Sequence, residues 1–416
     1  MKTKAYPNYK TSGVEWLGDV PEHWEVKKVG FLFSVQLGKM LQPDSASGND
    51  ELVPYLKALH VQWEKINFDD LPEMWASPND VTKFSVKNGD LLVCEGGEVG
   101  RAAILNGFDK TAIIQNALHR VRSNTSSVLF LMYVLESASN QKWFEILCNK
   151  ATIAHLTGEK FSALRIPSPT LPEQQAIATF LDRETGHIDA LIAKKKRLLS
   201  LLAEQRTALI SRAVTKGLTP FKLKPSGVEW LGDVPEHWEV KRVKHIVFLR
   251  SGEGITTDDI DDTGDYPVYG GNGFRGYTSN FTHEGHYALI GRQGALCGNI
   301  NYAIGKFWAS EHAVVASPSK PHATIWLGEL LRLMNLNQYS ISAAQPGLAI
   351  DRIKELQIPV PPLPDQQAIA AFLDCETAKI DTLSAKVQKA IERLREYRTA
   401  LISAAVTGKI DVREAV

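Results

Sequence analysis

Two blocks of this 416-residue chain carry side chains that suit the edges of nucleic-acid bases, set among glycine-rich loops. Arginine can bond the O6 and N7 atoms of guanine, and asparagine or glutamine can bond N6 and N7 of adenine. Each good pair of this kind discriminates between bases by about 1–3 kcal/mol. In the later block the candidates are Arg250, Tyr269, Asn272, Arg275, Tyr277, Arg292 and Gln293. In the earlier block they are Lys39, Gln42, Lys57, Gln62, Arg101 and Gln115.

Taken one at a time, each of these side chains is more simply explained as a solvated loop residue. The group from Tyr269 to Tyr277 is stronger, because several candidates share one short glycine-rich loop. We therefore interpret the two blocks as candidate readers of nucleic acid, which the rest of the chain must hold in place.

Several patterns invite an enzymatic interpretation, and none of them is complete. Gly271–Gly276 fits the GxGxxG fingerprint, but that motif needs a strand before it and a helix after it. The residues that follow form helices poorly, so an irregular loop is favoured. His23 and His237 each stand beside a tryptophan, and both are predicted to pack or cap rather than to act as general bases. The sequence also lacks an Asn-Pro-Pro-aromatic loop and the GxSxG and HExxH motifs.

Charge and cysteine content narrow the classes further. The chain has 47 basic and 47 acidic residues, which argues against binding nucleic acid by bulk electrostatics alone. Its four cysteines are far apart in the sequence, as is typical of reduced thiols in the cytosol. No stretch approaches the roughly 20 apolar residues of a membrane span, and the first residues lack the apolar run of a signal peptide. We expect a cytoplasmic protein with no membrane contact and no metal site of its own.

The elements that would position the two blocks are repeated along the chain. The sixteen residues Ser12–Lys27 recur without a change at Ser226–Lys241. A second repeat relates Leu171–Val214 to Leu363–Val406, while the blocks in between share only traces of each other. We call Ser12–Lys27 and Ser226–Lys241 the lead segments. Matching frames with unlike inserts predict two different readers held in equivalent positions.

The second repeat predicts two long helices. Each begins at a proline-containing first turn and has no proline afterwards. Apolar residues recur in steps of three and four, which is typical of a coiled-coil seam, and two such stripes in one chain most simply pack on each other. We expect an antiparallel pair. The predicted seam comprises Leu181, Ile188, Leu191, Leu198, Leu202 and Leu209 with Leu373, Ile380, Leu383, Val387, Leu394 and Leu401.

The inserts read as mixed α/β structure. Short strands are expected at 90–94 and 286–290 and helices at 128–136 and 325–335, whereas 54–55 and 267–269 look like edge strands or loops. Weak internal matches suggest that both inserts have one fold with different surfaces. The expected domains are 1–170 and 219–362, separated by a helix at 171–218 and followed by a second helix and tail at 363–416.

These features together resemble the specificity (S) subunit of type I restriction–modification systems. The matching residues are the two lead segments, the Ile-Pro-x-Pro-x-Leu-Pro-(Glu/Asp)-Gln-Gln start of each helix at 166–175 and 358–367, and Thr-Ala-Leu-Ile-Ser near each helix end. Residues 288–295 and 307–313 also look like strands of the family's recognition domains. The resemblance covers the whole chain.

The resemblance implies a non-catalytic subunit with two α/β target recognition domains, joined by an antiparallel coiled coil with pseudo-two-fold symmetry. Each domain would read one half of a bipartite, asymmetric site in double-stranded DNA. The helices would set the spacing and dock two methyltransferase (M) subunits, with which motor-nuclease (R) subunits associate. The resemblance also implies that S-adenosylmethionine, ATP and magnesium are bound by those partners and not by this chain.

Two other classes stay open at the level of the sequence. The chain could be a stand-alone DNA-binding regulator or decoy, or an adaptor whose inserts bind proteins, which its neutral charge permits. A neighbouring gene for a methyltransferase would favour the specificity subunit over the regulator. Absence of DNA binding with and without that methyltransferase would favour the adaptor.

Overall fold

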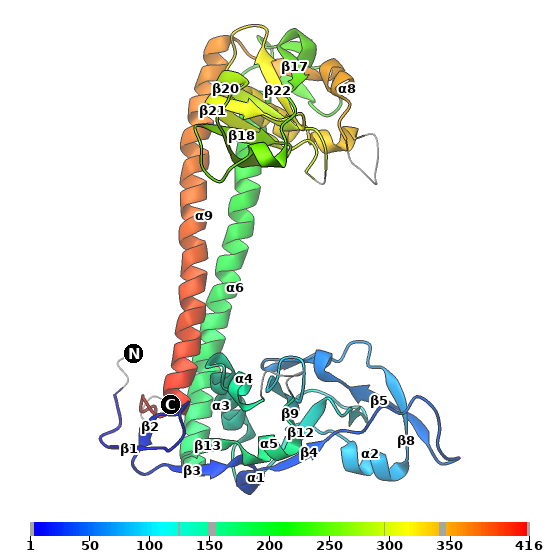
Figure 1. Ribbon diagram of the computed structural model, residues 1–416, viewed down its shortest axis with the longest axis vertical. Helices are drawn as coiled ribbons and strands as arrows, with labels where there is room; N and C mark the ends of the chain where they lie inside the picture. Colours follow the sequence, from blue (N-terminus) through cyan, green and yellow to red (C-terminus); the bar gives the residue numbers. More distant parts are fainter. Residues whose placement is uncertain (1–3, 124, 149–154, 295, 341–346, 414–416) are drawn as a thin grey trace. The chain divides into compact units, whose positions relative to one another are not determined.

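The computed structural model describes residues 4–123, 125–148, 155–294, 296–340 and 347–413. The chain divides into two compact units (Figure 1). The first unit combines Met1–Lys195 with Lys389–Val416, and the second is Lys196–Gln388. Each unit therefore contains one insert together with parts of both long helices.

The two long helices are α6 (Leu171–Lys216) and α9 (Leu363–Val406), of 46 and 44 residues. They run antiparallel, as predicted (Figure 1). In the first unit Arg398 of α9 pairs with Asp189 of α6 at 3.3 Å. In the second unit Arg206 of α6 pairs with Asp381 of α9 at 3.2 Å. Residue numbers thus rise along one helix as they fall along the other.

The buried stripe of this helix pair departs from the predicted seam at three of its twelve residues, Leu191, Leu198 and Leu383. In α6 the predicted residues Leu181, Ile188 and Leu202 are buried, but Leu191 and Leu198 are 42% and 38% exposed. The residues that follow them, Ile192 and Leu199, take their places, since Ile192 is buried and Leu199 is half-buried. Leu209, also predicted, is half-buried.

The same shift occurs in α9. Leu383 is 44% exposed and Ser384 beside it is half-buried, while Ile391 is buried. The remaining predicted residues are buried or half-buried; they are Leu373, Ile380, Val387, Leu394 and Leu401.

The prediction was wrong at these positions because neighbouring residues such as Leu191 and Ile192 are equally apolar, and only the packing of the two helices distinguishes them. The real stripe accepts polar side chains that find partners locally. Thr185 and Thr377 lie in it, and their hydroxyls donate to the carbonyls of Leu181 and Leu373 at 2.7 Å. A threonine bonded to its own helix adds little uncompensated polarity to a seam.

Adjacent residues of α6 test this corrected seam. We expect Ile192→Ala to lower the free energy of unfolding by about 2–4 kcal/mol, because it removes a buried side chain and leaves a cavity. Leu191→Ala should cost well under about 1 kcal/mol, because that side chain already meets solvent. Urea denaturation of both variants measures the difference. Equal losses, or a larger loss for Leu191→Ala, would restore the seam expected from the sequence.

Both inserts are built on the same antiparallel four-stranded core, which confirms the expectation of one fold in two copies. In the first unit the strand order is β10-β9-β12-β4, and in the second β21-β20-β22-β17 has the same connectivity. The bounds in the first unit are Ser34–Leu37 for β4, Leu91–Cys94 for β9, Ala102–Ile104 for β10 and Leu118–Arg122 for β12. In the second unit they are Val247–Ser251 for β17, His283–Gly291 for β20, Ile300–Ala309 for β21 and Ala313–Pro318 for β22.

A further pair of antiparallel strands accompanies each core; it forms part of a separate three-stranded sheet in the first unit and extends the core sheet in the second. In the first unit these are β5 (Glu51–Leu56) and β8 (Glu73–Ala76), with β11 (Ile113–Ile114) parallel to β5. In the second unit they are β18 (Tyr266–Gly270) and β19 (Gly273–Thr278), with β21 parallel to β18. β5 and β18 are inner strands, so the expectation of edge strands or loops around Pro54 and Pro267 was wrong. The second neighbour of each strand pairs only after the proline, at Tyr55–Leu56 and at Val268–Tyr269. Each proline therefore has a paired strand on one side only, where its missing N–H is tolerated.

A helix covers one face of each core sheet. These helices are α3 (Val128–Asn140) and α7 (Thr324–Leu333), near the expected bounds. In the second unit α7 buries Trp326, Leu327 and Leu330 in a cluster that also contains Ile369 and Leu373 of α9. A single apolar core therefore joins the second insert to the long helices.

Shorter elements complete both units. Each lead segment pairs with the strand before a long helix, β3 (Glu25–Lys28) with β13 (Arg165–Ser168) and β16 (Glu239–Arg242) with β23 (Gln357–Val360). The other strands are β1 (Tyr9–Thr11), β2 (Asp19–Pro21), β6 (Val61–Gln62), β7 (Lys65–Ile66), β14 (Leu223–Pro225) and β15 (Asp233–Pro235). The other helices are α1 (Val29–Leu32), α2 (Pro78–Phe84), α4 (Trp143–Leu147), α5 (Gly158–Ala163) and α8 (Ile350–Glu355). None of the described helices is long and apolar enough to cross a membrane.

Candidate nucleic-acid interface

One glycine in each unit fixes how the loops meet at the end of the core sheet. Gly38 follows β4, and Gly252 follows β17. A Cβ on Gly38 would overlap the carbonyl oxygens of Ile114 and Gln115, and one on Gly252 would overlap that of Ala309. The residue after each glycine donates its backbone N–H to the same neighbouring segment. Lys39 donates to the carbonyl of Ile114, and Glu253 donates to the carbonyl of Ala309. Two backbones therefore cross in contact, at a point where only glycine fits.

In the second unit this crossing gathers four loops. The Arg292 N–H donates to the His312 carbonyl at 2.8 Å, and its guanidinium donates to Ser251 Oγ at 3.1 Å. A Cβ on Gly271 would touch the carbonyls of His312 and Gln293. The ends of β17 and β20, the β18–β19 turn and the turn before β22 thus meet, and they bring Asn272, Arg292 and Gln293 together. We call these four loops the second loop face.

The candidates of the second unit lie in this face or beside it. Arg250, Asn272, Arg275 and Gln293 are exposed, while Arg292, Tyr269 and Tyr277 are half-buried. The rings of Tyr269 and Tyr277 both contact Phe274, at centroid distances of 6.3 and 5.1 Å. Phe274 is 54% exposed and was not among the candidates taken from the sequence, which considered polar side chains and tyrosines. Its position between glycines in the same loop was the available signal.

In the first unit most of the candidates are engaged within the protein. Lys39 Nζ lies 2.9 Å from Asp80 Oδ2, and only 13% of the lysine side chain is exposed. Burial alone would raise the pKa of Asp80, but its bonds to Lys39 and Ser77 lower it. Arg101 donates to the Ala58 carbonyl at 3.0 Å and to Glu98 at 3.1 Å. These two cations brace loops, and their charges are already paired.

The other candidates of the first unit are placed as follows. Gln42 donates to Asp50 at 3.0 Å, and Gln62 donates to the Leu59 carbonyl at 3.1 Å. Gln115 is half-buried and bridges to Lys39 at the crossing, whereas Lys57 lies at the end of β5 and is half-buried. The structure thus brings Lys39 and Gln115 together and leaves Gln42 and Gln62 apart from them in other loops.

The two units differ most where the extra pair of strands is joined. In the second unit β18 and β19 are connected by the two residues Gly271 and Asn272. In the first unit the matching strands β5 and β8 are connected by residues 57–72, which include β6 and β7. The frames are alike, so this connection distinguishes the two inserts.

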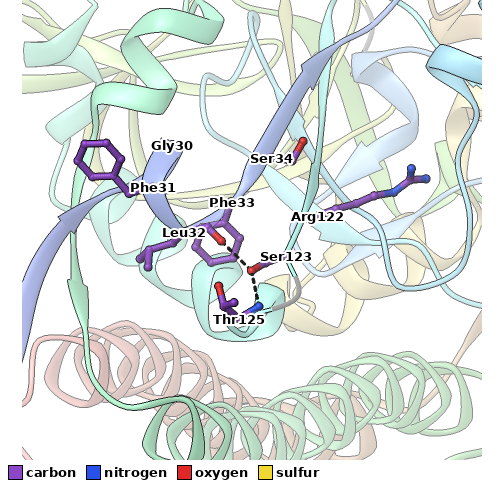
Figure 2. Close-up of a pocket in the computed structure, with 8 residues that line it drawn as sticks. All are labelled: Gly30, Phe31, Leu32, Phe33, Ser34, Arg122, Ser123 and Thr125. Atoms are coloured by element: carbon purple, nitrogen blue, oxygen red, sulfur yellow. Dashed lines mark hydrogen bonds between the residues drawn. The ribbon is translucent and has the colours of Figure 1, made fainter.

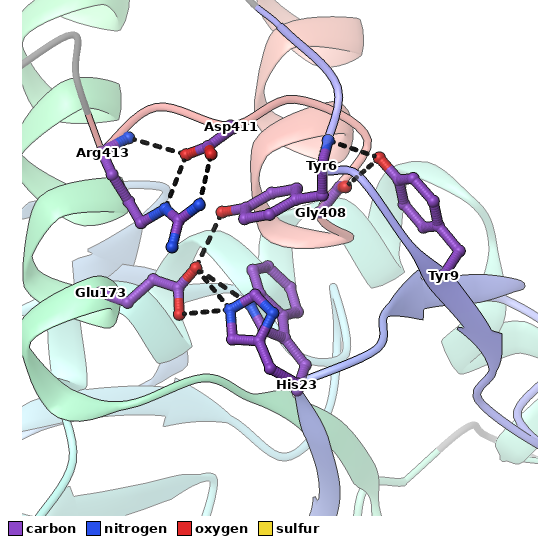
Figure 3. Close-up of polar contacts among 8 residues, drawn as sticks. Tyr6, Tyr9, His23, Glu173, Gly408, Asp411 and Arg413 are labelled. Atoms are coloured by element: carbon purple, nitrogen blue, oxygen red, sulfur yellow. Dashed lines mark hydrogen bonds and ion pairs between the residues drawn. The ribbon is translucent and has the colours of Figure 1, made fainter.

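A cluster of polar and aromatic residues at the start of α6 has the composition of a catalytic site (Figure 3). Glu173 accepts hydrogen bonds from the Tyr6 hydroxyl at 2.9 Å and the Trp24 indole at 3.0 Å, and His23 Nε2 lies 3.1 Å from its other oxygen. Burial and the Glu173 carboxylate raise the pKa of Tyr6, so this hydroxyl stays protonated and donates. The carboxylate also lies in the first turn of the helix, where negative charge is favourable.

The second unit repeats this cluster at the start of α9. His237 Nε2 lies 2.9 Å from Asp365 Oδ2, and the Trp238 indole donates to the same oxygen at 3.2 Å. Trp24 and Trp238 are fully buried. A recurring carboxylate–tryptophan–histidine contact that fastens each lead segment to its helix is a structural device, in agreement with the packing role expected for both histidines.

No other described cluster provides catalytic chemistry. A shallow depression of about 470 Å³ is lined by Gly30–Ser34 and by Arg122, Ser123 and Thr125 (Figure 2). Its arginine is paired with Asp90, and its Ser123 hydroxyl donates to the Leu32 carbonyl. The Gly271–Gly276 motif forms a strand hairpin with no helix after it, so the dinucleotide interpretation fails. Among the described residues no three His, Cys, Asp or Glu side chains are placed to hold a metal ion.

Comparison with known proteins gives one consistent result. A family model described as "Type I restriction modification DNA specificity domain" matches residues 21–200 and 235–393. The EcoprrI specificity subunit of Escherichia coli is 44% identical over 148 residues, which are 35% of this chain and 36% of that protein. The chain thus matches about a third of that relative's length. The MjaVIII specificity subunit of Methanocaldococcus jannaschii is 23% identical over 95% of this chain and 94% of its own length.

Solved structures share the fold. A chain from a study of complex assembly and conformational transition of the type I R-M system superposes with a TM-score of 0.69 at 15% identity, over 94% of this chain and 99% of that one. The HsdS subunit from Thermoanaerobacter tengcongensis gives 0.58 at 15% identity, over 94% and 98%.

Proposed function

The chain belongs to the family of type I restriction–modification DNA specificity subunits, and on this basis we propose that it selects a bipartite DNA site. Each insert reads one half of the site with the loops at the end of its core sheet. The observation that carries this proposal is the pair of matching frames with unlike connections, two residues after β18 and residues 57–72 after β5. Two inserts that share one core fold but differ in this connection suit a DNA site whose two halves have different sequences.

The chemistry belongs to partner subunits in this proposal. Two M subunits dock on the helices and methylate adenine with S-adenosylmethionine, and R subunits cleave DNA with ATP and magnesium in the cytoplasm. The absence of a complete active-site motif from the sequence supports this division of labour. The formal charge of zero does so as well, since a partner would supply part of the positive surface that DNA needs.

A gel-shift assay on a site taken from the methylome of the host tests the proposal. We expect weak or no retention by the chain alone and tight, sequence-specific retention once M subunits are added. Equal specific binding without M subunits would favour a stand-alone regulator or decoy. No binding under either condition would favour an adaptor that binds proteins.

A change of helix length tests the role of α6 and α9 in spacing. One turn of B-DNA is about 34–36 Å long. We expect the spacer, the base pairs between the two half-sites that neither insert contacts, to be about one turn long. Removing or adding one heptad in both helices together should change the spacer length found in the methylated motif. A variant complex that methylates the original motif, with its spacer unaltered, would show that the helices do not set it.

A further inference from the structure

The hairpin β18–β19 forms the outer edge of the second sheet. β19 is the last strand in the sheet order. At its base, Tyr277 exchanges two backbone hydrogen bonds with Asp261, at 2.8 and 2.9 Å. No strand pairing is found on the outer side of Gly273–Gly276 in the part of the chain that the structure describes. The tip of the hairpin is thus an edge of the sheet: the outer strand has no pairing partner at Gly273–Gly276 among the described residues, while β18 behind it pairs with β21 at Val268 and Tyr269. The exposed turn and outer strand have the hairpin form that the major groove of B-DNA admits.

This ribbon tip is held rigidly by the rest of the unit. Its turn packs on the His312 carbonyl, and a Cβ on Gly273 would meet the side chain of Asn301. Tyr269 stacks edge-on against Phe307, which is fully buried, at 5.8 Å. Phe274 then contacts Tyr269, so it is the outermost ring of a row anchored in the core. A large apolar side chain is presented to solvent in a fixed position.

Single exposed aromatic residues are common on protein surfaces and need no partner. Phe274 differs in being fixed by two tyrosines at the tip of a ribbon, next to the exposed side chains Asn272 and Arg275. Arg275 extends over Gly270, because a Cβ on that glycine would meet Arg275 Cδ. The tip therefore combines an apolar ring with a cation and an amide, as a base-reading ribbon requires.

The charges around the hairpin indicate which of its ends faces DNA. The carboxylates of Asp258, Asp259 and Asp261 line a depression that reaches Thr278, the last residue of β19. The base of the hairpin is thus acidic, and the phosphate backbone would be repelled there. The opposite end lies next to Arg292, and the nearby Glu311 carboxylate is 3.1 Å from His312 Nε2, so this is the less acidic end and the one that we expect to face DNA.

We propose that the tip of β18–β19 enters the major groove of the second half-site, where Phe274 contacts the 5-methyl group of a thymine and Arg275 contacts a phosphate. The proposal rests on the function proposed above. The thymine methyl group lies in the major groove and is read by apolar side chains, phenylalanine among them. The first unit has residues 57–72 in this position, so it would read its own half-site without such a contact.

Deoxyuridine tests the proposal, because it differs from thymidine only in that methyl group. The complex of the full chain with its M subunits is bound to duplexes in which each thymine of the second half-site is replaced in turn. At one position the loss of the methyl group should weaken binding by roughly three- to tenfold, which is the effect of about one buried methyl group. Phe274→Ala should bind the thymine and deoxyuridine duplexes equally.

Two further variants make the result specific. Phe248→Ala is the matched control, because Phe248 is 65% exposed in the same unit but lies at the start of β17. It should keep the preference for thymine.

Arg275→Ala should weaken binding to all sequences alike. It should also reduce the slope of log K against log salt concentration by about one, because one phosphate contact is lost.

The outcomes separate this proposal from the function on which it rests. If the wild-type complex methylates a bipartite motif but no thymine is sensitive, or Phe274→Ala keeps the sensitivity, the hairpin proposal is wrong and the function stands. A loss of sensitivity in Phe248→Ala equal to that in Phe274→Ala also overturns it. If no bipartite motif is methylated at all, both proposals fall.

Discussion

Gly38→Ala should abolish recognition of one half of the DNA site, and Gly252→Ala should abolish recognition of the other half. Each glycine lies where two backbones cross in contact, and an added Cβ would overlap backbone carbonyl oxygens that have no room to move. The loops at this crossing must then separate, which disturbs the backbone bonds from Lys39 to Ile114 and from Glu253 to Ala309. A displacement of about 1 Å is enough to spoil a positioned contact, so we expect a loss of specific binding of at least a hundredfold.

Neighbouring glycines provide matched controls in both units. A Cβ on Gly48 or on Gly254 would meet nothing within 4 Å, and neither residue has a positive φ. Gly48→Ala and Gly254→Ala should therefore bind like the wild type in a gel shift with M subunits. Circular dichroism and thermal unfolding check that all four variants fold. Normal recognition of both halves by Gly38→Ala and Gly252→Ala would show that the backbone crossing does not position the loops that contact DNA.

Arg398→Met should lower the stability of the first unit by about 3–5 kcal/mol. Arg398 of α9 pairs with Glu136 of α3 at 2.6 Å, with Asp189 of α6 at 3.3 Å, and with Glu64 between β6 and β7. Glu136 is 7% exposed and Arg398 16% exposed, so removing the cation leaves a carboxylate buried without its partner. Breaking one side of a buried ion pair has costs of this size.

The equivalent residue of the second unit gives the control for this change. Arg206 pairs with Asp381, and the two side chains are 31% and 60% exposed. Arg206→Met should cost less than about 1 kcal/mol, as exposed pairs do. Urea denaturation measures both variants, and hydrogen exchange at α3 localises the loss to the first unit. Similar effects of the two substitutions would show that burial of the Arg398 cluster contributes no extra stability.

The same cluster predicts a dependence of stability on pH. Burial, opposed by Arg398 and reinforced by Glu64, raises the pKa of Glu136 to about 7 from an ordinary value of 4.5. Between these values the folded chain binds more protons at this site than the unfolded chain does. The contribution of Glu136 to stability is therefore complete below about pH 4.5 and is lost as pH rises towards 7.

Glu136→Gln tests this sign directly. The difference in unfolding free energy between wild type and Glu136→Gln should shift against the wild type from pH 4.5 to pH 7 and then level off. Unfolding curves at several pH values provide the measurement. A difference that moves in favour of the wild type over this range would mean that Arg398 dominates burial and lowers the pKa.

Much of the architecture could be predicted from the sequence, because it depends on signals that recur within short segments. The helices α6 and α9 follow from repeated apolar spacing and from prolines confined to their first turns. The pairing follows from the need of two stripes to bury each other, and the antiparallel direction was predicted because a parallel pair would crowd the two inserts together. The sequence did not predict which residues are buried between the two helices. Ile192 and Leu191 are equally apolar, and only the packing against the partner helix distinguishes them.

The candidate interface was predictable in outline only. Asn272, Arg292 and Gln293 do meet, yet Lys39 is engaged with Asp80 and Arg101 with the Ala58 carbonyl, and both partners lie elsewhere in the sequence. Polar residues in a glycine-rich loop look alike in sequence whether they brace the loop or face solvent. The tertiary partner decides between these roles, and local patterns do not encode it.

The central claim, that each insert independently reads one half of the site, is tested most directly by exchanging one insert. Residues 30–170 are replaced by the corresponding block of a relative, the chain is expressed with its M subunits, and methylated adenines are mapped across the genome. We predict a bipartite motif in which one half changes while the other half and the spacer stay as they were. A motif that changes in both halves, or in neither, would contradict the account.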